Sequence, residues 1–245
     1  MYQTMNAILA TNVFTKWLGD FGEELYRNII AKGRWHYIVD GLLITLQVTF
    51  FAILIGLVIG FAIAIIRTTH DSTGKLRVSN FLCNIYLTVI RGTPVVLQLL
   101  ITYFIIFGSV NIDKVLVAII AFGINSGAYV AEIVRAGITS IDKGQMEAGR
   151  SLGFNYMQTM THVILPQAFK NVLPALANEF IVLLKETSVS GYIALEDLTK
   201  GGDIIRSQTY SAYIPLLIVA GIYLTLVIIF TALVKKLERR LSNER

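Results

Sequence analysis

Long uncharged apolar stretches constrain this chain more than any other feature. Residues 41–66 and 211–234 contain no Asp, Glu, Lys or Arg. Each stretch exceeds the ~20 helical residues that are needed to cross a hydrocarbon core of ~30 Å. Only 15% of the 245 residues are charged, compared with roughly 25% in soluble domains. We therefore predict an all-α membrane protein.

Five stretches are candidate transmembrane helices, at about residues 41–66, 80–110, 115–137, 171–184 and 211–234. The fourth is the weakest, because it is short and contains Pro174 and Glu179. The first includes Gly56 and Gly60 at the spacing that lets two helices pack closely. Together the five spans form one transmembrane domain, residues 38–245.

The distribution of basic residues predicts the orientation of the spans. Lys and Arg are concentrated in residues 67–77, in residues 135–170 and in the tail from residue 235. With five spans, these three segments lie on one side of the membrane, and the positive-inside rule makes that side cytoplasmic. The N-terminus is then outside and the C-terminus cytoplasmic. The net charge of +5 reflects topology rather than nucleic-acid binding.

Residues 1–37 form a separate segment before the first span. Apolar residues recur there at helical spacing, at Phe14, Trp17, Leu18, Phe21, Leu25 and Ile29. This pattern predicts an amphipathic helix, which either lies in the outer membrane interface or packs on the outer end of the bundle.

The second span is interrupted by Arg91-Gly92-Thr93-Pro94. Pro94 lacks a backbone donor and Gly92 permits bending, so we expect the helix to break there. Such a break frees backbone N–H groups that suit a carboxylate at membrane depth. Gln98 lies about one turn further along the chain.

Ionisable residues within spans are costly and usually face a cavity or a partner. Besides Arg91, the candidates are Glu132, Glu179 and Glu186, and a purely structural role is the favoured interpretation for Glu179. Glu186 stands beside Thr187 and Ser188. An acid next to two hydroxyls indicates either a site for an ammonium group or a helix end with hydroxyl caps.

The connection at residues 139–168 is longer than a simple link between two spans. It carries Met146, Leu152, Phe154 and Met157 at helical spacing, with Gly153 where two short helices would separate. This composition is typical of a surface that fits another protein.

The motifs of metal, disulfide and nucleotide chemistry do not occur. Cys83 is the single cysteine, and no C-x-x-C or H-E-x-x-H is found, so we expect no metal and no cofactor. No Walker loop occurs, so the chain cannot cradle ATP phosphates by that route and depends on another protein for energy.

The loop at residues 139–168 closely resembles the EAA loop of ABC importer permeases. Glu147, Ala148, Gly153, Leu165 and Pro166 match that motif in register, whereas Gly149 replaces its second Ala and Val163 replaces its Ile. With RGTPVVLQ (91–98), NSGAYVAEIVR (125–135) and KETS (185–188), the chain resembles the permease subunits of the polar amino-acid uptake family. That family includes the subunits for histidine, arginine, glutamine, glutamate and cystine.

The resemblance implies the type I ABC importer permease architecture and assigns roles to individual residues. The implied substrate-path residues are Arg91, Gly92, Thr93, Gln98, Glu186, Thr187 and Ser188. The implied ATPase-coupling residues are Glu147, Ala148, Gly149, Gly153, Phe154, Leu165 and Pro166. Glu186 stands where the family more often has Asp, so its carboxylate reaches one methylene further.

The resemblance also implies the partners of a multi-pass protein of the bacterial cytoplasmic membrane. These are two copies of an ATP-binding subunit, a second permease subunit (identical or paralogous), and an extracytoplasmic amino-acid-binding protein. The chain itself would not be an enzyme, because its partner would hydrolyse ATP. The alternatives are an integral-membrane enzyme, for which His162 and the intramembrane acids would be candidates, and an ATP-independent channel or carrier subunit. For the enzyme, no pairing of a nucleophile with a base and no set of metal ligands is found, and the channel or carrier leaves the loop at residues 139–168 unexplained.

Overall fold

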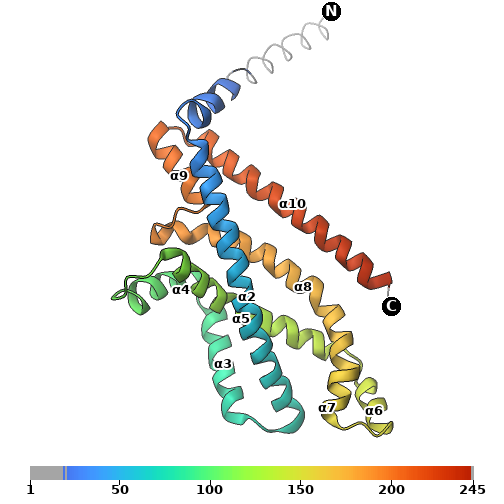
Figure 1. Ribbon diagram of the computed structural model, residues 1–245. Helices are drawn as coiled ribbons and strands as arrows, with labels where there is room; N and C mark the ends of the chain where they lie inside the picture. The colour runs from blue at the N-terminus through green and yellow to red at the C-terminus, as the bar shows by residue number, and fades with distance from the viewer. Residues whose placement is uncertain (1–18, 20, 244–245) are drawn as a thin grey trace, which may run out of the picture.

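The computed structural model describes residue 19 and residues 21–243, and these residues form helices joined by turns. Here η denotes a π or 3₁₀ helix. The elements are η1 Tyr26–Ile30, α2 Trp35–Thr73, α3 Arg77–Gly92, α4 Val95–Ile101, η2 Thr102–Ile106, α5 Lys114–Thr139, α6 Lys143–Ser151, α7 Tyr156–Thr159, η3 Met160–Ile164, α8 Leu165–Glu186, η4 Thr187–Ile193, α9 Leu198–Thr209 and α10 Tyr213–Asn243 (Figure 1).

The centre of the fold is the close parallel pair of α2 and α5. A Cβ on Gly56 would lie 2.9 Å from Ser126 Oγ, and one on Gly60 would lie 2.6 Å from Val130 Cβ. Only glycine allows the two helices to approach this closely, which increases their van der Waals contact within the membrane. The spacing of Gly56 and Gly60 in the sequence thus has a structural reason.

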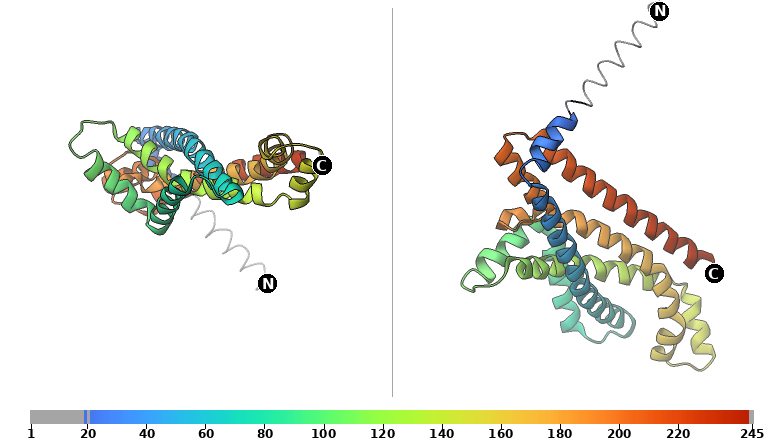
Figure 2. Two further views of the ribbon diagram at one scale, coloured as in Figure 1. Left: turned by 90° about the horizontal axis from the view of Figure 1, so that it is seen from below. Right: turned by 45° about the horizontal axis from the view of Figure 1, so that its top comes forward.

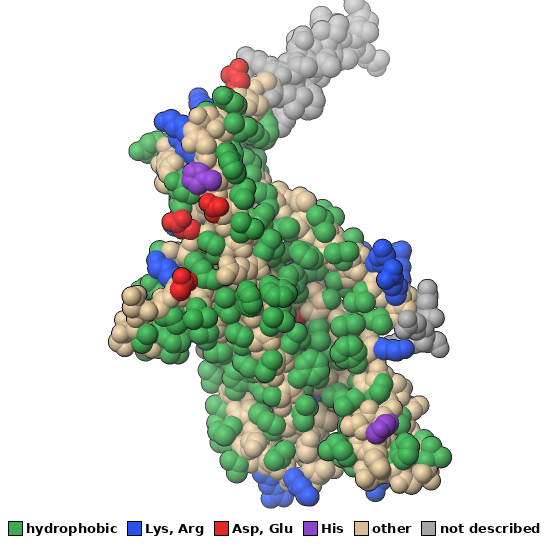
Figure 3. Space-filling view, in the orientation of Figure 1, with side chains coloured by type: hydrophobic (Ala, Val, Ile, Leu, Met, Phe, Trp, Pro, Cys, Tyr) green, Lys and Arg blue, Asp and Glu red, His purple; other side chains and the backbone are tan. Residues whose placement is uncertain are grey.

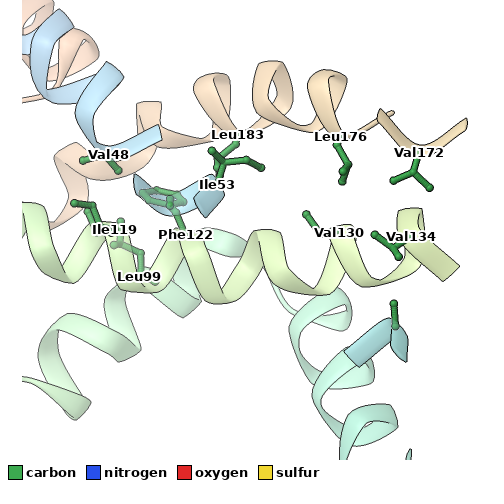
Figure 4. Close-up of a cluster of buried hydrophobic side chains, with 14 of the residues drawn as sticks. Val48, Ile53, Leu99, Ile119, Phe122, Val130, Val134, Val172, Leu176 and Leu183 are labelled. Carbon is green, nitrogen blue, oxygen red and sulfur yellow. The ribbon is translucent and has the colours of Figure 1, made fainter. Parts of the chain in front are cut away.

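The main apolar cluster surrounds Phe122 of α5, which is fully buried. Figure 4 shows Phe122 among Ile53 of α2, Leu99 of α4 and Leu183 of α8. Four helices that are distant in sequence therefore share one core, and α5 lies at its middle.

Within the described residues, three helices, α2, α5 and α10, are long and apolar enough to cross a membrane. The pair formed by α3 and residues 95–106 passes the same test together, but it is bent by 109° at Thr93-Pro94. The predicted helix break is therefore confirmed. The helix α8, which contains Pro174, does not pass the test, so the count of five spans stays a prediction.

The two ends of the molecule carry different small elements. The helices α6 and α7 project from the end opposite α9, and α10 extends past α8 with most of its surface exposed (Figures 1 and 2). Apolar side chains cover the middle of the face in Figure 3; basic side chains without acidic neighbours lie at its lower end and near the end of α10, whereas basic and acidic side chains are mixed at its upper end. This distribution agrees with the charge asymmetry of the sequence.

The described part of the N-terminal segment packs on the rest of the chain. Phe21, Leu25 and Ile29 contact an apolar cluster formed by α9 and α10. Arg34 donates from Nε to Gln208 Oε1 at 3.0 Å, which ties this segment to α9. The other expected apolar positions, Phe14, Trp17 and Leu18, lie outside the described residues.

Candidate functional site

The helix break is stabilised by the side chain of Gln98. At Thr93 and Pro94 the backbone is extended, with ψ 147° and 137°. Gln98 Nε2 donates to the carbonyl oxygens of Ile90 (2.7 Å) and Thr93 (3.1 Å) and to Thr93 Oγ1 (2.9 Å). These bonds satisfy carbonyl groups that the end of α3 leaves without helical partners. The structure thus brings Gln98 and Thr93 together.

A polar connection extends from this break through α5. Asn125 Nδ2 donates to Gln98 Oε1 at 2.9 Å. The adjacent Ser126 donates from Oγ to Glu179 Oε1 of α8 at 3.0 Å. Asn125 is 2% exposed and its Oδ1 has no hydrogen-bond partner, while Glu179 is 7% exposed. Polar groups buried at this depth are typical of a site that receives a polar ligand.

Sequence reasoning assigned no role to Asn125 or Ser126, and it named Glu179 as a candidate but favoured a structural role for it. The sequence contains one indication that Glu179 belongs with Glu186. The two acids are seven residues apart, so they lie on the same face of one helix. The contacts of Asn125 and Ser126 depend on helix packing, which no local pattern reveals.

The residues after α8 separate into different environments. Glu186 is partly buried at the helix end. Thr187 is fully buried and donates from Oγ1 to the Leu184 carbonyl at 2.8 Å, so its hydroxyl caps the helix. Ser188 lines a pocket of about 350 Å³ with residues of α9 and α10. The segment η4, which contains both hydroxyls, contacts α4 and so adjoins the break.

A cluster of arginines surrounds Glu132 of α5. Glu132 Oε1 accepts a hydrogen bond from Arg67 of α2, and Glu132 Oε2 accepts one from Arg135 at 3.3 Å. Arg91 Nη1 lies 3.9 Å from Glu132 Oε1, and the Arg91 guanidinium lies 6.0 Å from the centre of the Tyr129 ring. This cluster ties the end of α3 to α2 and α5.

The loop predicted to contact another protein forms two short helices with a glycine turn between them. Gly153 has φ +86°, and its N–H donates to the Arg150 carbonyl at 3.0 Å. Gly149 is buried, and a Cβ there would lie 2.9 Å from Thr159 Oγ1. Asn155 and Gln158 form a reciprocal cap at the start of α7. These contacts fix the angle between α6 and α7.

The same loop exposes apolar side chains at the projecting end of the molecule. Leu152, Phe154 and Met157 are 79%, 40% and 64% exposed. Exposed apolar groups that gather in a polar loop mark a surface for another protein. The other implied coupling residues lie nearby in the chain: Glu147 and Ala148 are exposed on α6, and Leu165 and Pro166 begin α8.

The described residues form a bundle of membrane-length helices with a central helix break and a projecting loop that exposes apolar side chains, an arrangement typical of a membrane transport subunit. The family of binding-protein-dependent transport system inner membrane components matches residues 56–243. The chain belongs to this family. It is a multi-pass protein of the bacterial inner membrane.

Relatives with known names support the same assignment. The arginine transport system permease ArtQ of Bacillus subtilis is 40% identical over 209 residues, which cover 84% of this chain and 93% of the relative. The glutamine transport system permease GlnP of Escherichia coli K12 is 35% identical over 208 residues, with the same coverage. A crystal structure of an amino acid ABC transporter with histidines matches with a TM-score of 0.77 at 44% identity, covering 83% of this chain and 94% of that one. The prediction of an ABC importer permease of the amino-acid uptake family is confirmed.

Proposed function

We propose that this permease subunit moves polar amino acids across the membrane by alternating access, with ATP hydrolysed by a partner subunit. The observation that carries the proposal is a partly buried set of polar side chains between the helix break and α8, in which two hydrogen-bonded pairs meet at adjacent residues of α5. It comprises Gln98, Asn125, Ser126 and Glu179. Relatives named for arginine and glutamine transport support an amino-acid substrate.

Two groups of residues hold the two ends of the amino acid in this proposal. Glu186 accepts the ammonium group, because a carboxylate is a strong acceptor for a cation that has lost its water. Thr93 holds the carboxylate, with Arg91, Gly92 and Gln98 beside it. Thr187 and Ser188 shape the wall around Glu186. Glu179 is a second acid on the same helix face.

The projecting loop transmits the action of the ATPase. Phe154 and its exposed apolar neighbours enter a cleft of the ATP-binding subunit, with Glu147 and Ala148 at the rim. Gly149 and Gly153 keep α6 and α7 at a fixed angle. Leu165 and Pro166 pass the movement to α8, and the helices then rock about the substrate site.

The proposed assembly has two permease subunits, two ATP-binding subunits and an extracytoplasmic binding protein. Each permease has five spans, with α8 as the fourth, an outer N-terminus and a cytoplasmic C-terminus. The basic residues at the ends of the helices support this orientation. Single cysteines at Ser72 and Gln158 are expected to react only from the cytoplasm, and one at Lys200 only from outside. Labelling of Gln158 and Lys200 from the same side would refute the five-span arrangement.

The substrate role of Glu186 is tested in the complex with its ATPase, in proteoliposomes that also receive the binding protein. We expect Glu186→Gln to lower uptake per assembled complex at least tenfold, while basal ATP hydrolysis and thermal stability are retained. The neighbouring, exposed Lys185→Gln is the matched control and should transport normally. An unchanged rate in Glu186→Gln would remove Glu186 from the site. A loss of stability at an unchanged rate would show that Glu186 is structural.

A further inference from the structure

The helix α3 has two different exposed faces. Leu82, Ile85 and Val89 are exposed and apolar. A separate exposed stripe consists of Asn84, Thr88 and Arg91, at spacings of four and three residues. Such spacing places the three polar side chains on one side of the helix. Within a membrane, a polar stripe of this kind faces a water-filled cavity or a partner rather than lipid.

The polar stripe of α3 lines a cavity of about 370 Å³ between α2, α3 and α5. The cavity is lined by Arg67, Asn84, Leu87, Thr88, Arg91, Gly92 and Glu132. We call it the inner pocket. Since Gly92 belongs to it, the pocket begins at the helix break. It lies on the side of the break where α3 begins, which is the cytoplasmic side in the proposed orientation.

The inner pocket has an excess of positive charge. Arg67, Arg91 and Arg135 share the single carboxylate of Glu132. Arg91 is the least engaged of the three, because its side chain is 47% exposed and its nearest acid lies 3.9 Å away. Its side chain makes no hydrogen bond within the part of the chain that the structure describes. A guanidinium group with free donors at membrane depth favours a carboxylate, which it binds with two parallel hydrogen bonds.

We propose that the inner pocket binds the α-carboxylate of the amino acid as it leaves the helix break toward the cytoplasm. The inference rests on the proposed function. It adds a second binding site for the amino acid, on the cytoplasmic side of the helix break. Arg91 supplies the free donors. Thr88 and Asn84 supply neutral hydrogen bonds, and Glu132 keeps Arg67 and Arg135 from holding the carboxylate too tightly for release.

The charge of the pocket is measured with a cysteine at Thr88. The background is Cys83→Ala, in the complex with its ATPase in phosphatidylcholine nanodiscs. The reaction rates of Thr88→Cys with an anionic and a cationic methanethiosulfonate are compared. We expect the anionic reagent to be preferred. Adding Arg91→Gln should lower this preference roughly fivefold, and adding Glu132→Gln should raise it by a similar factor, because each changes one charge nearby. A cysteine at the exposed outer residue Tyr210 is the control and should respond to neither change.

The ligand is tested by protection of the same cysteine. Millimolar arginine or glutamine is expected to slow the anionic reagent at Thr88→Cys several-fold, whereas the corresponding α-carboxamides, which lack the carboxylate, should not. No anion preference, no protection, or equal protection by the carboxamides would each overturn the proposal. If phosphatidylglycerol removes the anion preference and no amino acid protects, the pocket takes a lipid phosphate and the proposal is wrong.

Uptake by the wild-type complex separates this inference from the function on which it rests. If the wild-type complex takes up arginine or glutamine but neither amino acid protects Thr88→Cys, the inner-pocket proposal is refuted and the proposed function stands. Absence of uptake for every amino acid refutes the proposed function, and the inner pocket with it.

Discussion

The glycine turn between α6 and α7 allows a test of the coupling role of the loop, because replacing Gly153 with Ala adds only one methyl group. Gly153 has φ +86°, and nothing lies within 4 Å of the position of a Cβ there. The substitution Gly153→Ala therefore meets no neighbour and changes only the backbone energy. An L-residue in this conformation costs about 1–2 kcal/mol. This cost lowers the ratio of native to non-native turns by a factor of roughly 5 to 30, which bounds the loss of native turns.

The assay is ATP-driven uptake per assembled complex in proteoliposomes, measured beside basal ATP hydrolysis. We expect Gly153→Ala to insert normally but to lower uptake by up to the factor given above, because fewer loops have the docking angle. Gly153→Asn is the matched variant. It should keep most of the activity, because Asn tolerates positive φ far better than Ala. Normal uptake in Gly153→Ala, or an equal defect in both variants, would refute the reasoning.

Three further predictions concern other parts of the chain. Glu147→Lys should leave insertion intact and abolish substrate-stimulated ATP hydrolysis, and normal stimulation would exclude its docking role. Gly60→Leu should lower the thermal midpoint of the purified protein by several degrees, because a Cβ there already lies 2.6 Å from Val130 Cβ; Gly221→Leu, with open space around it, is the control. Burial raises the pKa of Asp197 to about 6 from its ordinary 3.8, so the folded state binds this proton more tightly than the unfolded state. Protonation of Asp197 should therefore contribute up to about 3 kcal/mol of stability as the pH falls from about 7 to about 4. In thermal scans Asp197→Asn, which keeps one of the two side-chain oxygens that accept hydrogen bonds at the helix cap, should lack this contribution, and an equal pH dependence in both proteins would contradict the argument.

The features that the sequence predicted well have local causes. The break at Thr93-Pro94 follows because Pro94 lacks an N–H and its predecessor avoids the helical conformation. The turn at Gly153 follows because two short helices with apolar faces need a sharp connection there. The long apolar helices follow from length and composition alone.

The features that the sequence did not predict depend on how helices align. The pair of Arg67 and Glu132 spans 65 residues of sequence, and that of Ser126 and Glu179 spans 53. A shift of one turn between α2 and α5 would separate Arg67 from Glu132, and a similar shift between α5 and α8 would separate Ser126 from Glu179. The alignment is set by the glycines that fit against side chains of the facing helix. Glu179 was interpreted as structural because its neighbours on α5 were not evident from the sequence.

The close pairing of α2 and α5 has a mechanical consequence. Because Gly56 and Gly60 leave no room for sliding, and because Arg67 ties the two helices at one end, we expect the pair to turn as one rigid body. α5 leads directly into α6, so a torque on the projecting loop acts on this body. α2 has 39 residues and is about 58 Å long. A rotation of about 5° at its cytoplasmic end therefore swings the outer end through about 5 Å, which is comparable to the width of an amino-acid side chain.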